Sequence, residues 1–362
     1  MTRGVLPWQS LGLFDEQQYK KNLRRRTLLR NRPITACCIS PSNKLVISGT
    51  ASGVLETYDL VNSYARSTNA TTTTHSTSSI HSASYIHAQD GCIYCLVSDD
   101  QRGLLWLGGD RDLRCFHWDY LDAHLPHGEH HVEVVEKINL GCGETNGIAI
   151  HPAHNTIIVA GGDTKAYLYD YEYSKVVGAL KGHEEYLHDV ILDKKSGSLV
   201  ATCSEDCTLR LWDLRNHQCI RIFDRKRKHR HSSSKRFVTS ALFDNDSDFL
   251  LMGDGAKNLS IGYVGTGEVV HSISLTGIPS RIRAYEENVL LSCFDDSVVR
   301  LFTWRLNSVA EAKGCNKSVF DLAVSNDESM FVSCGTSDLL DVYIRSFVSS
   351  MRLRSQSQYL GS

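Results

Sequence analysis

His183, Ser204 and Asp206 are the residue types of a hydrolytic triad, in which a histidine activates a serine hydroxyl and a carboxylate orients the histidine. The same types can instead form a static cluster, in which the imidazole, a hydroxyl from Thr202 or Ser204 and the carboxylate satisfy one another. The sequence contains no GxSxG elbow, HExxH motif, P-loop or glycine-rich dinucleotide turn. We therefore predict structural roles for these residues, with no catalytic residue, metal, cofactor or small-molecule substrate.

The segment that holds these residues runs from Gly182-His183 to Trp212-Asp213 and resembles a WD repeat. Alternating apolar positions predict strands over 186–191, 198–202 and 208–212. In WD propellers, to which the segment is similar, a tetrad of hydrogen-bonded side chains forms from His183, Thr202 or Ser204, Asp206 and Trp212. One such unit cannot bury its apolar face alone, so further units are expected.

Positions equivalent to Trp212 recur at intervals of about 40 to 60 residues, against about 40–45 for a typical WD unit. They fall at Tyr58, Trp118, Tyr169, Trp212, Gly262, Phe302 and Tyr343. Six residues earlier, four units have the aspartates Asp112, Asp163, Asp206 and Asp296, and the others have Ser52, Ala256 and Ser337. The long intervals hold polar insertions, including a Ser/Thr-rich one at about 63–86, expected to be disordered. The period predicts an all-β, seven-bladed propeller over 33–353.

Composition is consistent with one large β domain. The 362 residues are 41% hydrophobic, which suffices for a core, and the formal net charge of −2 favours no class of partner. No apolar run reaches the 18 residues of a membrane span, and the N-terminus lacks a hydrophobic signal core. We expect the twelve cysteines to be small buried hydrophobes in a reducing compartment. The Cys92-Ile-Tyr-Cys95 pair stands alone, without the second pair of a zinc site.

Residues 1–32 form an N-terminal extension in which 14–30 predict a short basic helix. Tyr19 and Leu23 lie one turn apart, flanked by Arg24, Arg25 and Arg26. The helix could cover a blade edge in solvent, dock a protein partner or contact nucleic acid. At the other end, Phe347 to Leu353 competes with Thr27 to Leu29 for the last outer strand, and 354–362 form a tail.

A basic loop is predicted at 225–236, where like charges repel one another. Its cations are Arg225, Lys226, Arg227, Lys228, Arg230, Lys235 and Arg236. Three interpretations stay open: a nuclear import signal, a phosphate contact to RNA or DNA, and a plain solvated loop. Because no aromatic residue is interleaved, any RNA contact would be weak and nonspecific.

Several segments resemble the THO complex subunit 6 family of WD proteins, over roughly residues 30–345. They are HAQDGCIYCLVSDD (87–100), IIVAGGDTKAYLYD (157–170), GHEEYLHDV (182–190), CTLRLWDLR (207–215) and KRFVTSALFDNDSDFLLMGDG (235–255). The resemblance implies a non-enzymatic subunit of the nuclear THO/TREX assembly, with a cytoplasmic pool left open. That assembly acts in mRNA processing and export, and its propeller subunit helps join protomers. The Ser/Thr insertion and the basic loop depart from the family pattern.

A different function is suggested by Trp212-Asp-Leu-Arg215, which matches the WDxR tetrapeptide of cullin-4 ubiquitin ligase substrate receptors. In that interpretation Arg215 projects past the blade and contacts the ligase adaptor. The tetrapeptide is also frequent in ordinary WD repeats. A general scaffold unrelated to either assembly is the third alternative.

Overall fold

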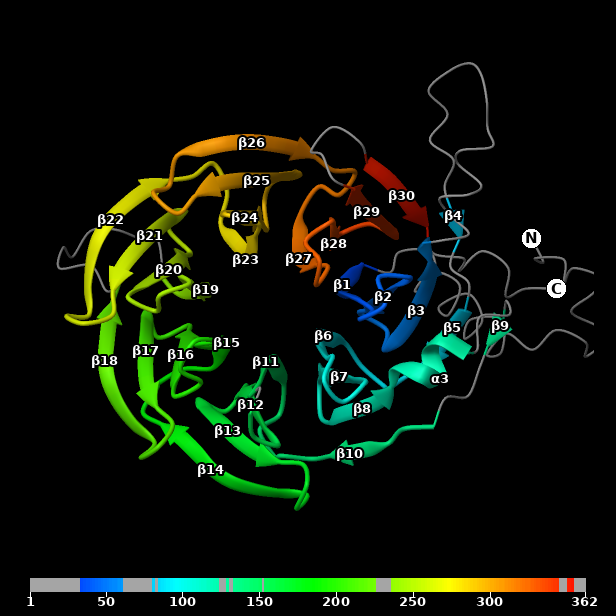
Figure 1. Ribbon diagram of the computed structural model, residues 1–362, viewed down its shortest axis with the longest axis horizontal. Coiled ribbons are helices and arrows are strands. Elements are labelled where there is room, and N and C mark those ends of the chain that lie inside the picture. Colours follow the sequence, from blue (N-terminus) through cyan, green and yellow to red (C-terminus); the bar gives the residue numbers. More distant parts are fainter. Residues whose placement is uncertain are drawn as a thin grey trace, which may run out of the picture.

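Seven antiparallel sheets stand around a central axis in the computed structural model (Figure 1). It describes residues 33–60, 80–81, 84–123, 128–129, 133–151, 153–225, 236–344 and 350–354. The predicted all-β, seven-bladed propeller is confirmed, and α3 (Trp118–Ala123) is the one helix whose whole range lies among these residues. The predicted N-terminal helix and most of the Ser/Thr insertion lie outside the described residues.

Each blade has four antiparallel strands in chain order from the axis outward, and only the short strands β4 and β9 interrupt that order, in blades 1 and 2. The inner strands are β1 (Ile34–Ile39), β6 (Ile93–Asp99), β11 (Thr145–Ile150), β15 (Leu187–Leu192), β19 (Val238–Phe243), β23 (Pro279–Tyr285) and β27 (Val319–Val324). The second strands are β2 (Leu45–Thr50), β7 (Leu104–Gly109), β12 (Thr156–Gly161), β16 (Leu199–Ser204), β20 (Phe249–Asp254), β24 (Asn288–Cys293) and β28 (Met330–Gly335).

The third strands are β3 (Val54–Asp59), β8 (Leu113–His117), β13 (Lys165–Asp170), β17 (Thr208–Asp213), β21 (Asn258–Tyr263), β25 (Val298–Thr303) and β29 (Leu339–Ile344). The outer strands are β5 (Ser84–His87), β10 (Glu136–Ile138), β14 (Lys175–Lys181), β18 (Gln218–Asp224), β22 (Glu268–Ser274), β26 (Ser308–Lys313) and β30 (Ser350–Arg354). Two short strands add a fifth member to a blade. β9 (Gly128–Glu129) pairs in parallel with β5, and β4 (Ile80–His81) pairs in parallel with β30.

The apolar core lies between blades rather than within them. Successive strand residues point to opposite faces, so a blade's buried side chains divide between its two neighbours. Val200 of β16 packs in the cluster shared with blade 3, whereas Ala201 and Cys203 pack in the cluster shared with blade 5. Among the described residues there are seven such clusters, one for each gap between adjacent blades. Every blade therefore depends on both neighbours for burial.

The gap between blades 7 and 1 closes the ring in the same way as the other gaps. β1 lies against β27, and Cys37 and Tyr58 share an apolar cluster with Cys334 and Val342. Of the two segments predicted to compete for the last outer strand, the C-terminal one takes it, because β30 pairs with β29 from Leu339↔Arg354 to Tyr343↔Ser350. The other candidate, 27–29, lies outside the described residues.

The anchor predicted for blade 2 is wrong. Trp212 pairs with Val200, the second residue of its neighbouring strand, and Phe116 makes the equivalent pair with Leu105. Trp118 instead begins α3, and its indole N–H donates to Ser98 Oγ (2.9 Å). Residues two apart in a strand share a face. From the sequence alone, Phe116 and Trp118 were therefore both candidates for the anchor of blade 2.

The correction of the anchor also changes the aspartate assigned to blade 2. Asp110 lies six residues before Phe116, and its Oδ2 accepts the Cys92 amide (2.8 Å). Asp112, the predicted residue, forms an ion pair with Lys137 (3.1 Å). The turn acceptor of blade 2 is therefore Asp110.

All seven inner strands carry a register shift between their first and third residues. The third residues are Ala36, Cys95, Gly147, Asp189, Ser240, Arg281 and Asp321. Four of these form what we call the inner network: Asp189, Ser240, Arg281 and Asp321. A β-bulge re-aims the side chain beside it, so this recurring shift sets the network at one level of the ring.

Arg281 is the centre of the inner network. Its Nη1 lies 3.2 Å from Asp189 Oδ2 in blade 4, and its Nε donates to Asp321 Oδ1 in blade 7 (3.1 Å). Ser240 Oγ of blade 5 donates to Asp189 Oδ2 (3.0 Å), and the Cys37 amide of blade 1 donates to Asp321 Oδ2 (3.1 Å). Burial alone would lower the pKa of Arg281, but the two carboxylates raise it above its ordinary value. The network links blades 4 through 7 to blade 1.

Replacing Arg281 with methionine should lower the free energy of unfolding by about 3–5 kcal/mol, because two buried carboxylates lose their shared cation. Urea denaturation followed by circular dichroism measures the change. Arg283→Met is the matched control on the same strand, since Arg283 is more exposed and lies 3.8 Å from Asp321. We expect the control to cost less than about 1 kcal/mol, and equal losses in both variants would contradict this role for Arg281.

Candidate functional site

The structure brings His183, Thr202, Asp206 and Trp212 together in blade 4. The indole N–H of Trp212 donates to Thr202 Oγ1 (2.8 Å), which lies 2.7 Å from His183 Nε2. His183 Nδ1 lies 2.7 Å from Asp206 Oδ2. Because an indole only donates and a carboxylate only accepts, the bonds run in one direction: Trp212 to Thr202, Thr202 to His183, and His183 to Asp206.

Ser204 lies beside this chain but is not a link in it. Its hydroxyl donates to the backbone carbonyl of Tyr186 (3.1 Å) and accepts the amide of Asp206 (3.1 Å). Thr208, which the sequence interpretation missed, donates to Asp206 Oδ1 through both its hydroxyl (2.6 Å) and its amide (2.8 Å). The signal was available, since an aspartate followed two residues later by threonine is typical of a side-chain-capped turn.

The geometry of this cluster is that of a clamp rather than a triad. Thr202 and Ser204 are completely buried, so neither hydroxyl can reach a substrate carbonyl. Burial alone would raise the pKa of Asp206, but hydrogen bonds from His183 and Thr208 lower it well below its ordinary value. The Glu184 amide also donates to its Oδ2 (3.2 Å). Asp206 therefore fixes the segment that enters β15 to the turn between β16 and β17.

Beside the clamp lies a partly exposed aromatic surface that the sequence interpretation also missed. The rings of Tyr186 and His188 are 5.0 Å apart, and those of His188 and Phe237 are 5.3 Å apart. His188 Nε2 lies 3.0 Å from Glu205 Oε2. Partial burial and then Glu205 and Glu144 raise the pKa of the Tyr186 hydroxyl. These residues precede or begin inner strands of blades 4 and 5, a position where exposed aromatic side chains suit protein contact.

Arg215 projects from the end of β17 and is held in place by Asp213. The guanidinium donates two hydrogen bonds to the carboxylate, from Nε to Oδ1 (2.9 Å) and from Nη2 to Oδ2 (2.7 Å). The Arg215 side chain keeps 75% of its surface exposed, whereas Asp213 keeps 11%. The hydrogen bonds from Arg215 lower the pKa of Asp213 to about 2. A bidentate pair fixes direction, so the exposed guanidinium is presented in a defined orientation.

The two ends of the predicted basic loop lie within the described residues. Arg225 is not part of a free loop, because its Nη2 lies 2.9 Å from Asp254 Oδ2 and donates to Ser260 Oγ (3.0 Å) in blade 5. Its side chain is only 9% exposed. Arg236 is half-buried. The remaining cations of the loop, and the candidate docking residues Tyr19, Leu23, Arg24, Arg25 and Arg26, lie outside the described residues.

The cysteine pair contacts two different blades. Cys92 Sγ lies 3.9 Å from Thr35 Oγ1 of blade 1, whereas Cys95 Sγ lies 3.7 Å from the Thr145 carbonyl of blade 3. All twelve cysteines are free thiols. Within the described residues, no group of three or more His, Cys, Asp or Glu side chains has the arrangement of a metal site. The same residues contain no helix with the length and apolarity to cross a membrane.

Comparison with known proteins finds similarity along most of the chain. The family model of the WD domain, G-beta repeat, matches residues 174–213. THO complex subunit 6 of Arabidopsis thaliana is 27% identical over 243 residues, 63% of this chain and 64% of that protein. The human THO complex subunit 6 is 22% identical over 315 residues, 84% of this chain and 87% of that protein.

Other relatives are matched over less of their length. The zebrafish (Danio rerio) THO complex subunit 6 homolog is 25% identical over 56% of this chain and 62% of its own, so the chain spans less than two thirds of the plant and fish relatives that it matches. The nuclear distribution protein PAC1 of Arthroderma otae is 29% identical, but over only 38% of its length. The resemblance identified from the sequence is confirmed.

Replacing Asp206 with asparagine should lower the free energy of unfolding at pH 7 by about 1–3 kcal/mol, because the clamp loses a charged acceptor. The pKa of Asp206 is lower in the folded state than the ordinary aspartate pKa of 3.8. Its carboxylate therefore stabilises the folded protein fully at pH values above 3.8, and this contribution is lost as the pH falls toward the folded-state pKa. The gap between wild type and variant should therefore narrow below about pH 4. Urea denaturation at pH 7 and pH 3 measures it, and a gap that is unchanged at pH 3 would contradict the assigned cause.

Proposed function

We propose that this WD40-repeat protein, a homologue of THO complex subunit 6, is a non-catalytic scaffold subunit of a nuclear THO/TREX-type complex in mRNA processing and export. The observation that carries the proposal is the extent of the match with the human relative, which covers 84% of this chain. A match of that length includes several blades, whereas the generic WD repeat model matches residues 174–213 only.

The geometry supports a scaffold because it supplies rigid surfaces on separate blades. The inner network and the seven interblade clusters hold the blades in one arrangement, so loops on different blades keep fixed distances from one another. The aromatic surface formed by Tyr186, His188 and Phe237, which spans blades 4 and 5, is one such contact point. In this role the propeller contacts other THO subunits and helps the complex reach a higher-order assembly. Direct RNA contact through the basic segments stays a prediction.

The second candidate function is a substrate receptor of a cullin-4 ubiquitin ligase. The observation that favours it is the exposure of Arg215, which Asp213 holds at the end of the WDxR tetrapeptide. A side chain fixed by a bidentate pair loses little further freedom on binding. It could therefore serve as a contact for an adaptor.

Affinity purification of the full chain, followed by cross-linking and mass spectrometry, tests the primary function. We expect the large coiled-coil THO subunits to be recovered and to form cross-links with lysines of the propeller. The Arg281→Met variant should recover less of them, because it loosens the ring. Purification of the intact chain without any THO subunit would contradict the proposal.

Replacing Arg215 with alanine separates the two functions. Under the ligase interpretation it should weaken adaptor binding at least about tenfold, as removal of a central arginine contact typically does. THO association and unfolding free energy should stay unchanged, since an exposed ion pair contributes little to stability. Lys181→Ala, an exposed cation on β14, is the matched control. Titration with purified adaptor measures the effect, and an affinity equal to wild type in the Arg215 variant would refute the ligase function.

A further inference from the structure

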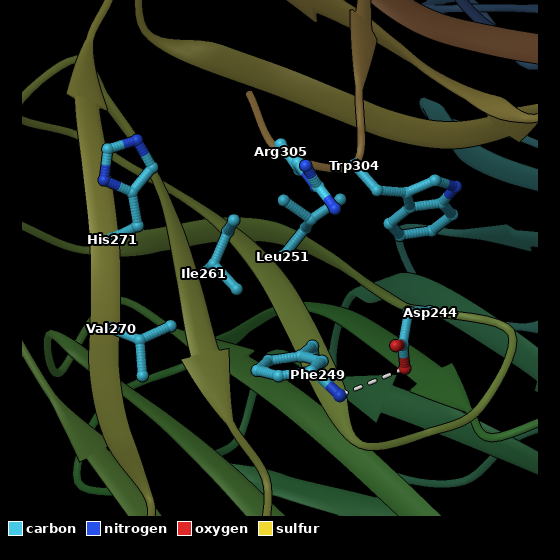
Figure 2. Close-up of a pocket in the computed structure, with 8 residues that line it drawn as sticks. All are labelled: Asp244, Phe249, Leu251, Ile261, Val270, His271, Trp304 and Arg305. Atoms are coloured by element: carbon cyan, nitrogen blue, oxygen red, sulfur yellow. Dashed lines mark hydrogen bonds between the residues drawn. The ribbon is translucent and has the colours of Figure 1, made fainter. Parts of the chain in front are cut away.

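A cavity of about 430 Å³ is lined by residues of blades 5 and 6 (Figure 2), and no clamp residue is among them. Phe249 and Leu251 of β20, Ile261 of β21 and Val270 of β22 line it from blade 5. The hairpin that joins β25 to β26 in blade 6 contributes Trp304 and Arg305. The cavity is large enough for one aromatic or branched aliphatic side chain together with part of its backbone.

The surface around this cavity is unusually apolar for an exterior. Val270 is 56% exposed and Phe249 is 40% exposed, and the Phe249 ring lies 5.4 Å from that of Tyr263, which is itself 37% exposed. Leu251, at 2%, forms the buried end. Exposed apolar patches rimmed by polar groups mark interaction sites in soluble proteins. No side chain of the described residues fills the cavity.

The cavity adjoins an unpaired sheet edge. β22 is the outermost strand of its blade and pairs only with β21 among the described strands. The strand reads EVVHSIS and carries no lysine or arginine, whereas β14, β18 and β26 each carry at least one. Edge strands are commonly protected by such cations. An exposed edge without them suits the addition of another strand.

This propeller already accepts added strands at two outer edges. β4 pairs in parallel with β30 of blade 7, and β9 pairs in parallel with β5 of blade 1. In both cases the fifth strand comes from a segment outside the regular four-strand unit. The outer edge of a blade in this fold therefore pairs with an added segment, over two residues in each case, and β22 presents the same kind of edge next to a cavity.

The charges at the cavity favour an acidic segment. Arg305 is exposed and forms no ion pair with any described residue. Asp244, which also lines the cavity, already accepts the Phe249 amide at Oδ1 (3.0 Å), as Figure 2 shows. The Arg305 guanidinium is therefore free to pair with a carboxylate that follows or precedes the inserted side chain.

We propose that this site binds an extended segment of a partner protein that pairs as a fifth strand with β22. One aromatic or branched aliphatic side chain of the segment fills the cavity, and a neighbouring Asp or Glu pairs with Arg305. The site goes beyond the proposed function, because it does not depend on which complex the propeller joins.

A displayed library of random eight-residue peptides, selected on the full-length protein, tests the site. We expect enriched sequences to combine one large apolar residue with a nearby Asp or Glu. A labelled copy of the most enriched peptide then gives the Kd by fluorescence polarisation. Two further copies of this peptide carry N-methyl groups, one on the odd-numbered residues and the other on the even-numbered residues. One of the two should lose binding, because N-methylation removes the backbone N–H groups that donate hydrogen bonds to β22.

Two exposed substitutions locate the binding, and a third controls for surface effects. Val270→Asp and Arg305→Glu should each weaken the enriched peptide at least about tenfold. Val309→Asp, on β26 of the adjacent blade and 52% exposed, should leave the Kd within about twofold. Unfolding curves of all three variants should coincide with wild type. A library selected on Arg305→Glu should lose its preference for acidic residues.

The site is refuted if no peptide is enriched, if the enriched peptide binds Val270→Asp and Arg305→Glu as tightly as Val309→Asp, or if both N-methylated forms bind normally. Loss of THO association in the purification experiment would leave this result unaffected. The two proposals therefore fail separately.

Discussion

One guanidinium, placed between two carboxylates, connects the inner strands of three blades near the axis of this ring. Arg281 bonds Asp189 and Asp321 from blades that are not adjacent to each other, and Asp321 also accepts an amide of blade 1. Apolar packing joins each blade only to its neighbours. The ion pairs instead act across the ring, where removal of the cation would leave buried charges uncompensated. This arrangement links blades 4 to 7 and blade 1, in addition to the apolar packing between neighbours.

The sequence was informative wherever a residue type has one structural use. Trp212 and Asp206 identified blade 4, its turn and its register, because an indole donor and a turn aspartate have few alternative roles. The repeat period also predicted the anchor position of blade 5, although that position is occupied by Gly262, which has no side chain. The assignment failed in blade 2, because Phe116 and Trp118 are aromatic residues two positions apart, and only the pairing of Phe116 with Leu105 shows which one is the anchor. Side-chain type alone carries no information about register within such a pair.

Some of the site residues could be predicted from the sequence and others could not, depending on whether they lie within one repeat unit. The clamp could be predicted, since its members occupy one repeat unit and meet through local turns. The inner network could not, because Asp189, Arg281 and Asp321 lie in three units and only the closed ring brings them together. The same holds for the cavity between blades 5 and 6, which Val270 and Trp304 line from different blades.

Apart from the short strands β4 and β9, each blade is built from strands that are consecutive in the chain, and this order has a consequence for synthesis on the ribosome. Blades can form one after another as the chain emerges, since most strand pairing is local. Asp189 and Ser240 are made well before Arg281, so a nascent chain carries the carboxylate without its cation until blade 6 appears. Asp321 and the contact with β1 come later still. Vectorial assembly therefore ends with blades 6 and 7, of which blade 6 supplies the cation that Asp189 lacks and blade 7 supplies Asp321 and the contact with β1.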